Sequence, residues 1–150
     1  MQWKRRWTAR VGVSVVLLGL LGCGKSVHPV HGTVTFEGKP LASGGTITFL
    51  PLTEQTGKVA SGMIAEDGTY RLTTNRPGDG STPGEYRVVI MQSTEKEPTP
   101  TPDGTPVAPI LSVPLADRIP GIYADHYKSP LTAKVEASKS NELNFDLKRQ

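Results

Sequence analysis

Cysteine and tryptophan are scarce in this sequence, and the few copies lie near its N-terminus. The chain has one cysteine, Cys23, so it cannot form an intrachain disulfide. Its two tryptophans are Trp3 and Trp7. A folded domain after residue 23 must therefore be held together by its apolar core, and it has no tryptophan with which to build a binding platform.

A basic cluster is also missing from most of the chain. Four of the 17 Lys and Arg residues, and none of the 14 Asp and Glu residues, precede Cys23. The rest of the chain therefore carries 13 basic against 14 acidic side chains, a net charge of about −1. Because nucleic-acid binding depends on clustered Lys and Arg, the sequence predicts no nucleic-acid partner.

Long hydrophobic runs are limited to residues 11–22, which follow a basic segment at residues 1–10. A basic segment, a short apolar run and a small residue at its end are typical of a secretory signal peptide. A permanent membrane-spanning helix needs roughly 18 or more apolar residues, so this run is too short to remain as a span. We predict that residues 1–22 are a signal peptide that is removed on export.

The four residues Leu20-Leu21-Gly22-Cys23 resemble the lipobox of bacterial lipoproteins. The resemblance implies that Cys23 receives a diacylglyceryl group and, after cleavage, an acyl chain such as palmitate on its amine. Each buried methylene contributes about 0.8 kcal/mol, so two or three chains anchor a protein stably. We expect Cys23 to hold the protein to the cell membrane or outer membrane, on the extracytoplasmic side. The alternative is an ordinary secretion signal followed by a chance cysteine.

Residues 23–29 are interpreted as the lipidated cysteine and a short tether, and residues 30–150 as one domain. Val30, Gly32, Val34 and Phe36 alternate with polar residues, which predicts a half-buried strand. The same alternation predicts six further strands, at residues 46–49, 58–65, 69–73, 86–90, 131–137 and 143–147. We therefore expect an all-β fold, a seven-stranded Greek-key β-sandwich.

Two turn patterns support this interpretation. Asp67-Gly68 between two alternating segments is a strong hairpin signal, because glycine tolerates the positive φ of tight turns. Pro83-Gly84-Glu85-Tyr86 is similar to the tyrosine corner of Greek-key sandwiches, in which the Tyr hydroxyl bonds to nearby backbone.

A proline-rich insertion is expected between the fifth and sixth strands, at residues 93–130, which hold eight of the 13 prolines. Its first part, residues 94–105, is polar and is expected to be extended or disordered. Its second part is apolar and is expected to cover the sandwich. The apolar residues concerned are Val107, Ile110, Leu111, Val113, Leu115, Ile119, Ile122 and Tyr123.

Several local patterns together resemble small lipoproteins abundant in planctomycete bacteria, which carry a transthyretin-like, or carboxypeptidase regulatory-like, β-sandwich. The matching stretches are Val30 to Val34, Gly38 to Leu41, Asp67 to Tyr70, Pro83 to Val88, Ile119-Pro120 with Tyr123, Leu131 to Val135 and Phe145 to Leu147. The resemblance implies a fold and a location in the cell envelope. It implies no activity and no catalytic residues.

No metal, cofactor or catalytic site is predicted. His28 and His31 are three residues apart in an extended segment, so they point to opposite faces and cannot share an ion. Asp125-His126 has no accompanying nucleophile turn of the Gly-x-Ser-x-Gly type. The acidic residues that would be needed for calcium are isolated and are interpreted as turn formers: Asp67, Asp79 and Asp103.

The sequence therefore predicts a noncatalytic structural or protein-interaction module of the cell envelope, with an envelope protein as partner. Its contacts are expected in the segment from Ile110 to Tyr127 and on sheet edges. The alternative is a carbohydrate-binding module that recognises cell-wall glycan. Tyr123 and Tyr127 are the candidate contact residues for either ligand, although they are equally suited to packing the insertion against the sandwich.

Overall fold

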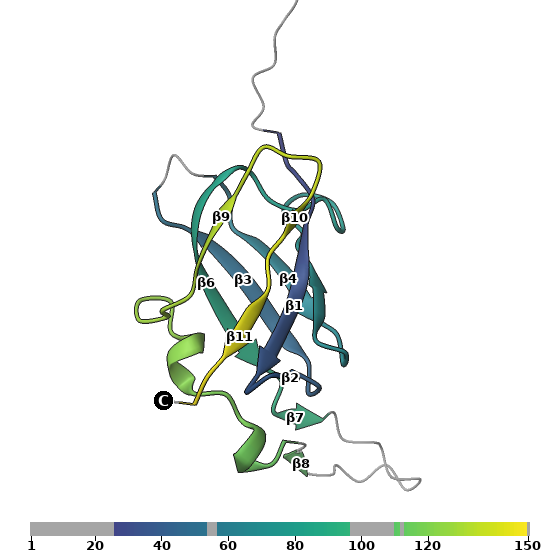
Figure 1. Cartoon of the computed structure of the whole chain (residues 1–150), viewed down its shortest axis with the longest axis vertical. Helices are drawn as coiled ribbons and strands as arrows, with labels where there is room; N and C mark the ends of the chain where they lie inside the picture. Colours follow the sequence, from purple (N-terminus) through teal and green to yellow (C-terminus); the bar gives the residue numbers. More distant parts are fainter. Residues whose placement is uncertain (1–25, 54–56, 97–109, 112, 150) are drawn as a thin grey trace, which may run out of the picture.

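The computed structural model describes residues 26–53, 57–96, 110–111 and 113–149 (Figure 1). Within them the fold is all-β, as predicted: there is no α-helix, and two short 3₁₀ turns, η1 (Leu115–Asp117) and η2 (Gly121–Ala124), interrupt the strands. None of these elements is a helix of the length and apolarity needed to cross a membrane. The predicted signal peptide, Cys23 and most of the polar part of the insertion lie outside the described residues.

One curled, largely antiparallel sheet forms the body of the molecule. Its strands are β1 (Val30–Phe36), β2 (Lys39–Pro40), β3 (Gly45–Pro51), β4 (Ala60–Ile64), β5 (Thr69–Arg71), β6 (Gly84–Gln92), β9 (Thr132–Val135), β10 (Asn141–Glu142) and β11 (Phe145–Leu147). Their order is β10-β1-β5-β4-β3-β6-β9, and β2 and β11 also pair with β1. The sheet curls so that β1, β10 and β11 lie in front of β3, β4 and β6 (Figure 1).

Each of the seven segments predicted as strands overlaps one strand of the structure, and β3 and β6 extend beyond the predicted bounds at both ends. The four strands that were not predicted are β2, β10 and the separate pair β7 (Glu95–Lys96) and β8 (Ile110–Leu111), and each has two residues. Two residues are too few to produce a recognisable alternation.

Alternating burial places the core inside the curl. In β1, residues 30, 32, 34 and 36 are buried and the residues between them are half-buried, as the alternation predicted. Ile47 and Phe49 are fully buried in β3. Phe49 lies at the centre of an aromatic cluster, with its ring centroid 5.8 Å from that of Tyr86 and 6.1 Å from that of Phe145. Because Phe145 belongs to β11 and Phe49 to β3, this cluster joins the front and back of the curl.

The two predicted turns are confirmed. The Tyr86 hydroxyl donates to the carbonyl of Thr82 at 2.7 Å, which ties the start of β6 to the loop before it. In the β4–β5 hairpin, the Asp67 carboxylate accepts from the backbone N–H and the hydroxyl of Thr69, at 2.9 and 2.6 Å. Gly68 has a φ of +80°, the conformation for which glycine was expected.

The segment after β8 partly covers the core. Val113 and Tyr123 are buried, and Ile119 and Ile122 pack against the core from outside. Leu115 is an exception, because we expected it to be buried and it is 80% exposed. It begins η1, a turn in which no residue is buried, so apolar character alone was a poor guide here.

His28, which was assigned to the tether, is attached to the domain. Its backbone N–H donates to the Ser81 carbonyl at 2.8 Å and its carbonyl accepts from the Ser81 N–H at 3.0 Å. Its ring Nδ1 lies 2.8 Å from the carbonyl oxygen of Ser138. The chain is therefore fixed to the domain at His28, two residues before β1 begins.

A polar cluster lies at the end of β1 where this strand pairs in parallel with β11. The Asp146 carboxylate lies 2.6 Å from the Lys148 ammonium and accepts from the Thr35 hydroxyl at 2.8 Å and the Gly38 N–H at 3.1 Å. The bond from Lys148, followed by that from Thr35, lowers the pKa of Asp146 from its ordinary 3.8 to about 2. The carboxylate therefore stays ionised in mildly acidic solution.

We predict that this cluster contributes to acid stability. Since the pKa of Asp146 is lower in the folded protein than in the unfolded chain, its contribution to the free energy of unfolding is complete above pH 3.8. The contribution is lost as the pH falls towards 2. Asp146→Asn should therefore have a flatter profile of unfolding free energy between pH 4 and 2 than the wild type, measured by urea denaturation. Glu85→Gln, which removes a carboxylate from β6, is the control. Parallel profiles for Asp146→Asn and the wild type would contradict the prediction.

Candidate functional site

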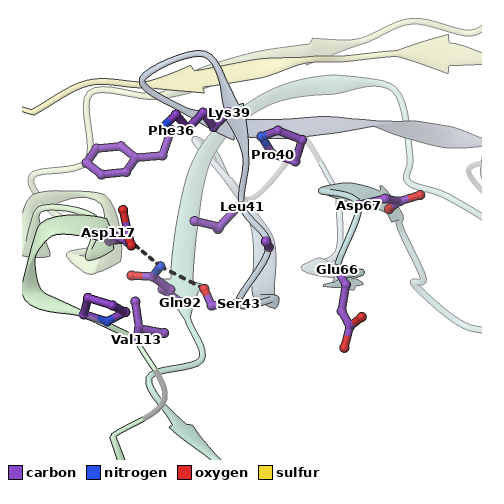
Figure 2. A pocket seen from close by; sticks show the side chains of 12 residues that line it. Phe36, Lys39, Pro40, Leu41, Ser43, Glu66, Asp67, Gln92, Val113 and Asp117 are labelled. Carbon is purple, nitrogen blue, oxygen red and sulfur yellow. Dashed lines mark hydrogen bonds between the residues drawn. The ribbon is translucent and has the colours of Figure 1, made fainter.

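A groove of about 730 Å³ lies at the C-terminal end of β1, and it is the candidate binding site. Its volume falls within the roughly 300–1,000 Å³ that is usual for ligand sites. Four parts of the chain meet there, and Figure 2 shows their side chains. The lining residues are Phe36, Lys39, Pro40, Leu41, Ala42, Ser43, Glu66, Asp67, Gln92, Val113, Pro114 and Asp117.

The floor of the groove is formed where the chain reverses after β1. Glu37 and Gly38 have positive φ values of 51° and 77°, which turn the chain back along β1. The Leu41 N–H then donates to the Val34 carbonyl at 3.1 Å, which fixes Leu41 beneath the turn. Leu41 is 3% exposed, so the floor is continuous with the core.

Gln92, at the end of β6, forms hydrogen bonds to the chain on both sides of the groove. Its amide nitrogen donates to the Ser43 hydroxyl at 2.8 Å and to the Asp117 carbonyl at 2.9 Å, and both contacts are drawn in Figure 2. Its amide oxygen accepts from the Ile119 N–H at 3.0 Å. One side chain therefore sets the distance between the 41–43 strand connection and the 113–119 segment.

Replacing Gln92 by alanine is predicted to loosen the 113–119 segment. Removing the side-chain oxygen of Gln92 leaves the half-buried Ile119 N–H without its acceptor, which costs about 1–3 kcal/mol. The Ile119 amide should therefore exchange its hydrogen roughly ten times faster or more, as measured by hydrogen exchange. Gln92→Glu keeps an oxygen that accepts from Ile119 and should retain most of the protection. Equal protection in the alanine variant and the wild type would show that Gln92 does not hold the segment.

Acidic side chains border the groove. Glu66 and Asp67 come from the β4–β5 turn, and Figure 2 shows them across the groove from Asp117 and Val113. All three carboxylate residues are exposed. The hydroxyl of Thr69, and then its N–H, lower the pKa of Asp67, so this carboxylate is ionised at neutral pH.

A cation is already held on the aromatic ring beside the groove. The guanidinium carbon of Arg149 lies 5.5 Å from the centroid of the Phe36 ring, a cation–π distance. The guanidinium also donates to the Ala116 carbonyl. The Arg149 backbone N–H donates to the Glu37 carboxylate at 2.6 Å. This end of the molecule therefore supplies both the carbonyl and the aromatic face that a guanidinium needs.

Tyr123, one of the two candidate contact residues, packs into the core. It is 4% exposed, and its hydroxyl donates to the Lys148 carbonyl at 3.1 Å and accepts from the Lys148 N–H at 3.0 Å. The hydroxyl thus satisfies both backbone groups of the residue that follows β11. Of the two alternatives that the sequence left open for Tyr123, the packing one is observed.

Tyr127, the other candidate, is 77% exposed and lies on a braced turn. The Asp125 carboxylate accepts a hydrogen bond from the Tyr127 N–H at 2.8 Å, and this bond is the main cause of the lowered pKa of Asp125. The Arg87 guanidinium donates to the carbonyls of His126 and Tyr127 at 3.2 and 3.0 Å. The His126 and Tyr127 ring centroids are 3.9 Å apart. The turn therefore presents an aromatic pair on a fixed backbone.

Among the histidines and acidic residues weighed as metal or catalytic groups, those that the structure describes are engaged in local structure, and Asp103 lies outside the described residues. His31 Nδ1 lies 3.3 Å from the Ser140 hydroxyl, and His28 bonds to the loop before β10. The Asp79 carboxylate accepts from three successive N–H groups, those of residues 74–76. In the part of the chain that the structure describes, no three His, Cys, Asp or Glu side chains lie together as metal ligands would.

Comparison with known proteins does not assign the chain to a family. No protein-family model and no curated protein matches it. Among solved structures, the chain is similar to a 9R-lipoxygenase from Cyanothece PCC8801, with 12% sequence identity and a TM-score of 0.40. The match covers 83% of this chain and 16% of the lipoxygenase.

Proposed function

We propose that the protein is a lipoprotein of the cell envelope, exported by residues 1–22, anchored through Cys23 and acting as a noncatalytic interaction module. Its fold is proposed to be a seven-stranded Greek-key sandwich of the transthyretin-like, or carboxypeptidase regulatory-like, type found in small planctomycete lipoproteins. Residues 93–130 are the proposed insertion. The all-β fold supports this assignment, and so does the tyrosine corner.

The position of the groove is the main observation in support of the proposal. The described chain begins at residue 26 at one end of the sheet, and β1 runs from there to Phe36, which lines the groove (Figure 1). Seven residues of strand span about 20 Å. A protein anchored at Cys23 would therefore present its groove away from the membrane, where it is accessible to another envelope protein.

The groove offers polar and charged groups suited to recognition. Among the described residues that line it, there is no histidine or cysteine. Its hydroxyl group, on Ser43, accepts a hydrogen bond from Gln92. Such a site has the shape and charge needed for recognition.

The proposal is tested by expressing the wild type and Cys23→Ala in cells, crosslinking, and identifying bound proteins by mass spectrometry. The wild type should partition into the detergent phase, carry lipid and retain the same protein partners in repeated experiments. Cys23→Ala should partition into the aqueous phase and lose those partners. Identical partitioning of the two proteins would refute the anchor, and the absence of any Cys23-dependent protein partner would refute the interaction role.

Carbohydrate binding through Tyr127 is the second candidate function. The observation that favours it is the exposed ring of Tyr127 on a braced turn, since sugars stack on exposed aromatic side chains. Binding to isolated cell-wall glycan should be lost in Tyr127→Ala and kept in Tyr127→Phe, because phenylalanine preserves the ring. Retention by the alanine variant would exclude this function for Tyr127.

A further inference from the structure

The groove combines an apolar floor with a net negative border. Three carboxylate residues, Glu66, Asp67 and Asp117, line it together with Lys39, which is the single basic residue among the described lining residues. The sum is three negative charges against one positive charge, or −2. Charges on opposite sides of a groove act together on a bound ligand. Anionic ligands such as phosphate or acidic lipid headgroups are therefore disfavoured, and cationic ligands are favoured.

The apolar floor requires more of the ligand than positive charge. Leu41 and Val113 are 3% and 5% exposed; Leu41 lies between the two acidic sides, and Val113 lies on the side of Asp117 (Figure 2). An apolar group placed on them would remove additional apolar surface from water, which contributes roughly 25 cal/mol per Å². A ligand that matches the groove thus has an apolar group in its middle and a positive charge on each side.

The contacts of Arg149 show that this end of the protein accommodates a cation. The Arg149 guanidinium lies over the Phe36 ring and donates to the Ala116 carbonyl, while its backbone N–H pairs with the Glu37 carboxylate. The aromatic ring, carboxylate and carbonyl are supplied by the end of β1, the turn after it and η1, three parts of the chain that lie at the groove. The carboxylates of Glu66 and Asp117 are exposed and have no ion-pair partner among the described residues.

We propose that the groove binds a short basic segment of another envelope protein, in which one apolar side chain lies on Leu41 and Val113 and flanking Lys or Arg residues pair with Glu66 and Asp117. This inference rests on the proposed function, because the membrane anchor turns the groove outward. It deepens that function by stating the chemistry of the partner. The protein's own membrane is not the ligand, since the groove and the tether lie at opposite ends of β1 (Figure 1).

The test measures peptide binding to the full-length lipidated protein in phosphatidylcholine nanodiscs, which carry no net charge. The probe is the capped, fluorescently labelled peptide Gly-Lys-Leu-Lys-Gly, compared with versions that have Gln or Glu in place of Lys, and binding is followed by fluorescence polarisation. The Lys peptide should bind about three to ten times more tightly than the Gln peptide, as expected for two exposed ion pairs. The Glu peptide should bind most weakly. Raising the salt concentration should reduce the difference.

The double variant Glu66→Gln/Asp117→Asn should bind the Lys and Gln peptides equally. The matched control is Glu85→Gln/Glu136→Gln, which removes the same charge from the β6–β9 side and should behave as the wild type. Equal affinity of the wild type for the Lys and Gln peptides, no binding of the Lys peptide, or full binding by the Glu66→Gln/Asp117→Asn variant would each overturn the inference. If Cys23-dependent protein partners are still recovered from cells in that case, the proposed function stands, and only the inference that the groove binds a basic segment is wrong.

Discussion

Replacing Phe49 by alanine is expected to destabilise the protein by about 3–5 kcal/mol, the usual cost of deleting a buried aromatic ring. Phe49 is fully buried and contacts Tyr86 and Phe145, so its removal leaves a cavity lined by rings from two other strands. Strands β3, β6 and β11 are held in place by the rest of the sheet and cannot move together to fill it. Because small domains have total stabilities of about 5–15 kcal/mol, much of the folding free energy would be lost.

The measurement is urea denaturation of the wild type and Phe49→Ala, followed by circular dichroism. Leu52→Ala is the control, since Leu52 lies just beyond β3 and is 43% exposed. It should change the free energy of unfolding by about 0.5 kcal/mol or less. A loss below about 1.5 kcal/mol in Phe49→Ala would mean that the aromatic cluster does not support the front and back of the curl together.

Replacing Gly80 by alanine is expected to cost about 2–4 kcal/mol, through two separate effects. Gly80 has a φ of +93°, a conformation that L side chains rarely adopt. An added Cβ would also collide with the backbone carbonyl of His28. Gly80 adjoins Ser81, whose two backbone bonds hold His28, so the substitution should release the N-terminal segment from the domain.

Gly38→Ala separates the two effects. Gly38 has a similar φ of +77°, but no atom lies within 4 Å of its added Cβ. Its substitution should therefore show the conformational cost alone, about 1–2 kcal/mol. Thermal unfolding measures both variants, and hydrogen exchange at His28 shows whether the segment is released. Equal losses in Gly38→Ala and Gly80→Ala would mean that the backbone near His28 moves aside at little cost.

Strands were predictable from the sequence because a half-buried strand repeats every two residues. Residues 30–36 contain a complete alternation, and the structure follows it at every position. The Asp67-Gly68 hairpin was equally clear, since its turn chemistry is local. Both predictions depend on neighbours in the sequence.

The groove was not predictable in this way, because its parts are distant in the sequence. Phe36, Glu66, Gln92 and Asp117 meet only when the sheet curls. Gln92 in particular has no sequence signal: it is one more polar residue at the end of a strand, and its importance comes from three partners in two other segments.

The two tyrosines show a second limit of sequence analysis. Tyr123 and Tyr127 are four residues apart in a segment without period-two or helical alternation, so burial could not be assigned to either. The 3₁₀ turn η2 directs Tyr123 into the core, whereas the turn braced by Asp125 leaves Tyr127 exposed. Distinguishing the buried tyrosine from the exposed one required the packed structure.

The parallel pairing of β1 with β11 also constrains the order of events during synthesis. Val34 pairs with Phe145, so these partners are 111 positions apart. Contacts between distant residues slow folding, because a long loop must close before they form. A nascent chain leaves β1 without this partner until residues 145–147 are available. A truncation before β11 would expose one edge of β1, and such an edge invites aggregation and proteolysis. The pairing thus makes the intact C-terminal strand a requirement for completing the sheet.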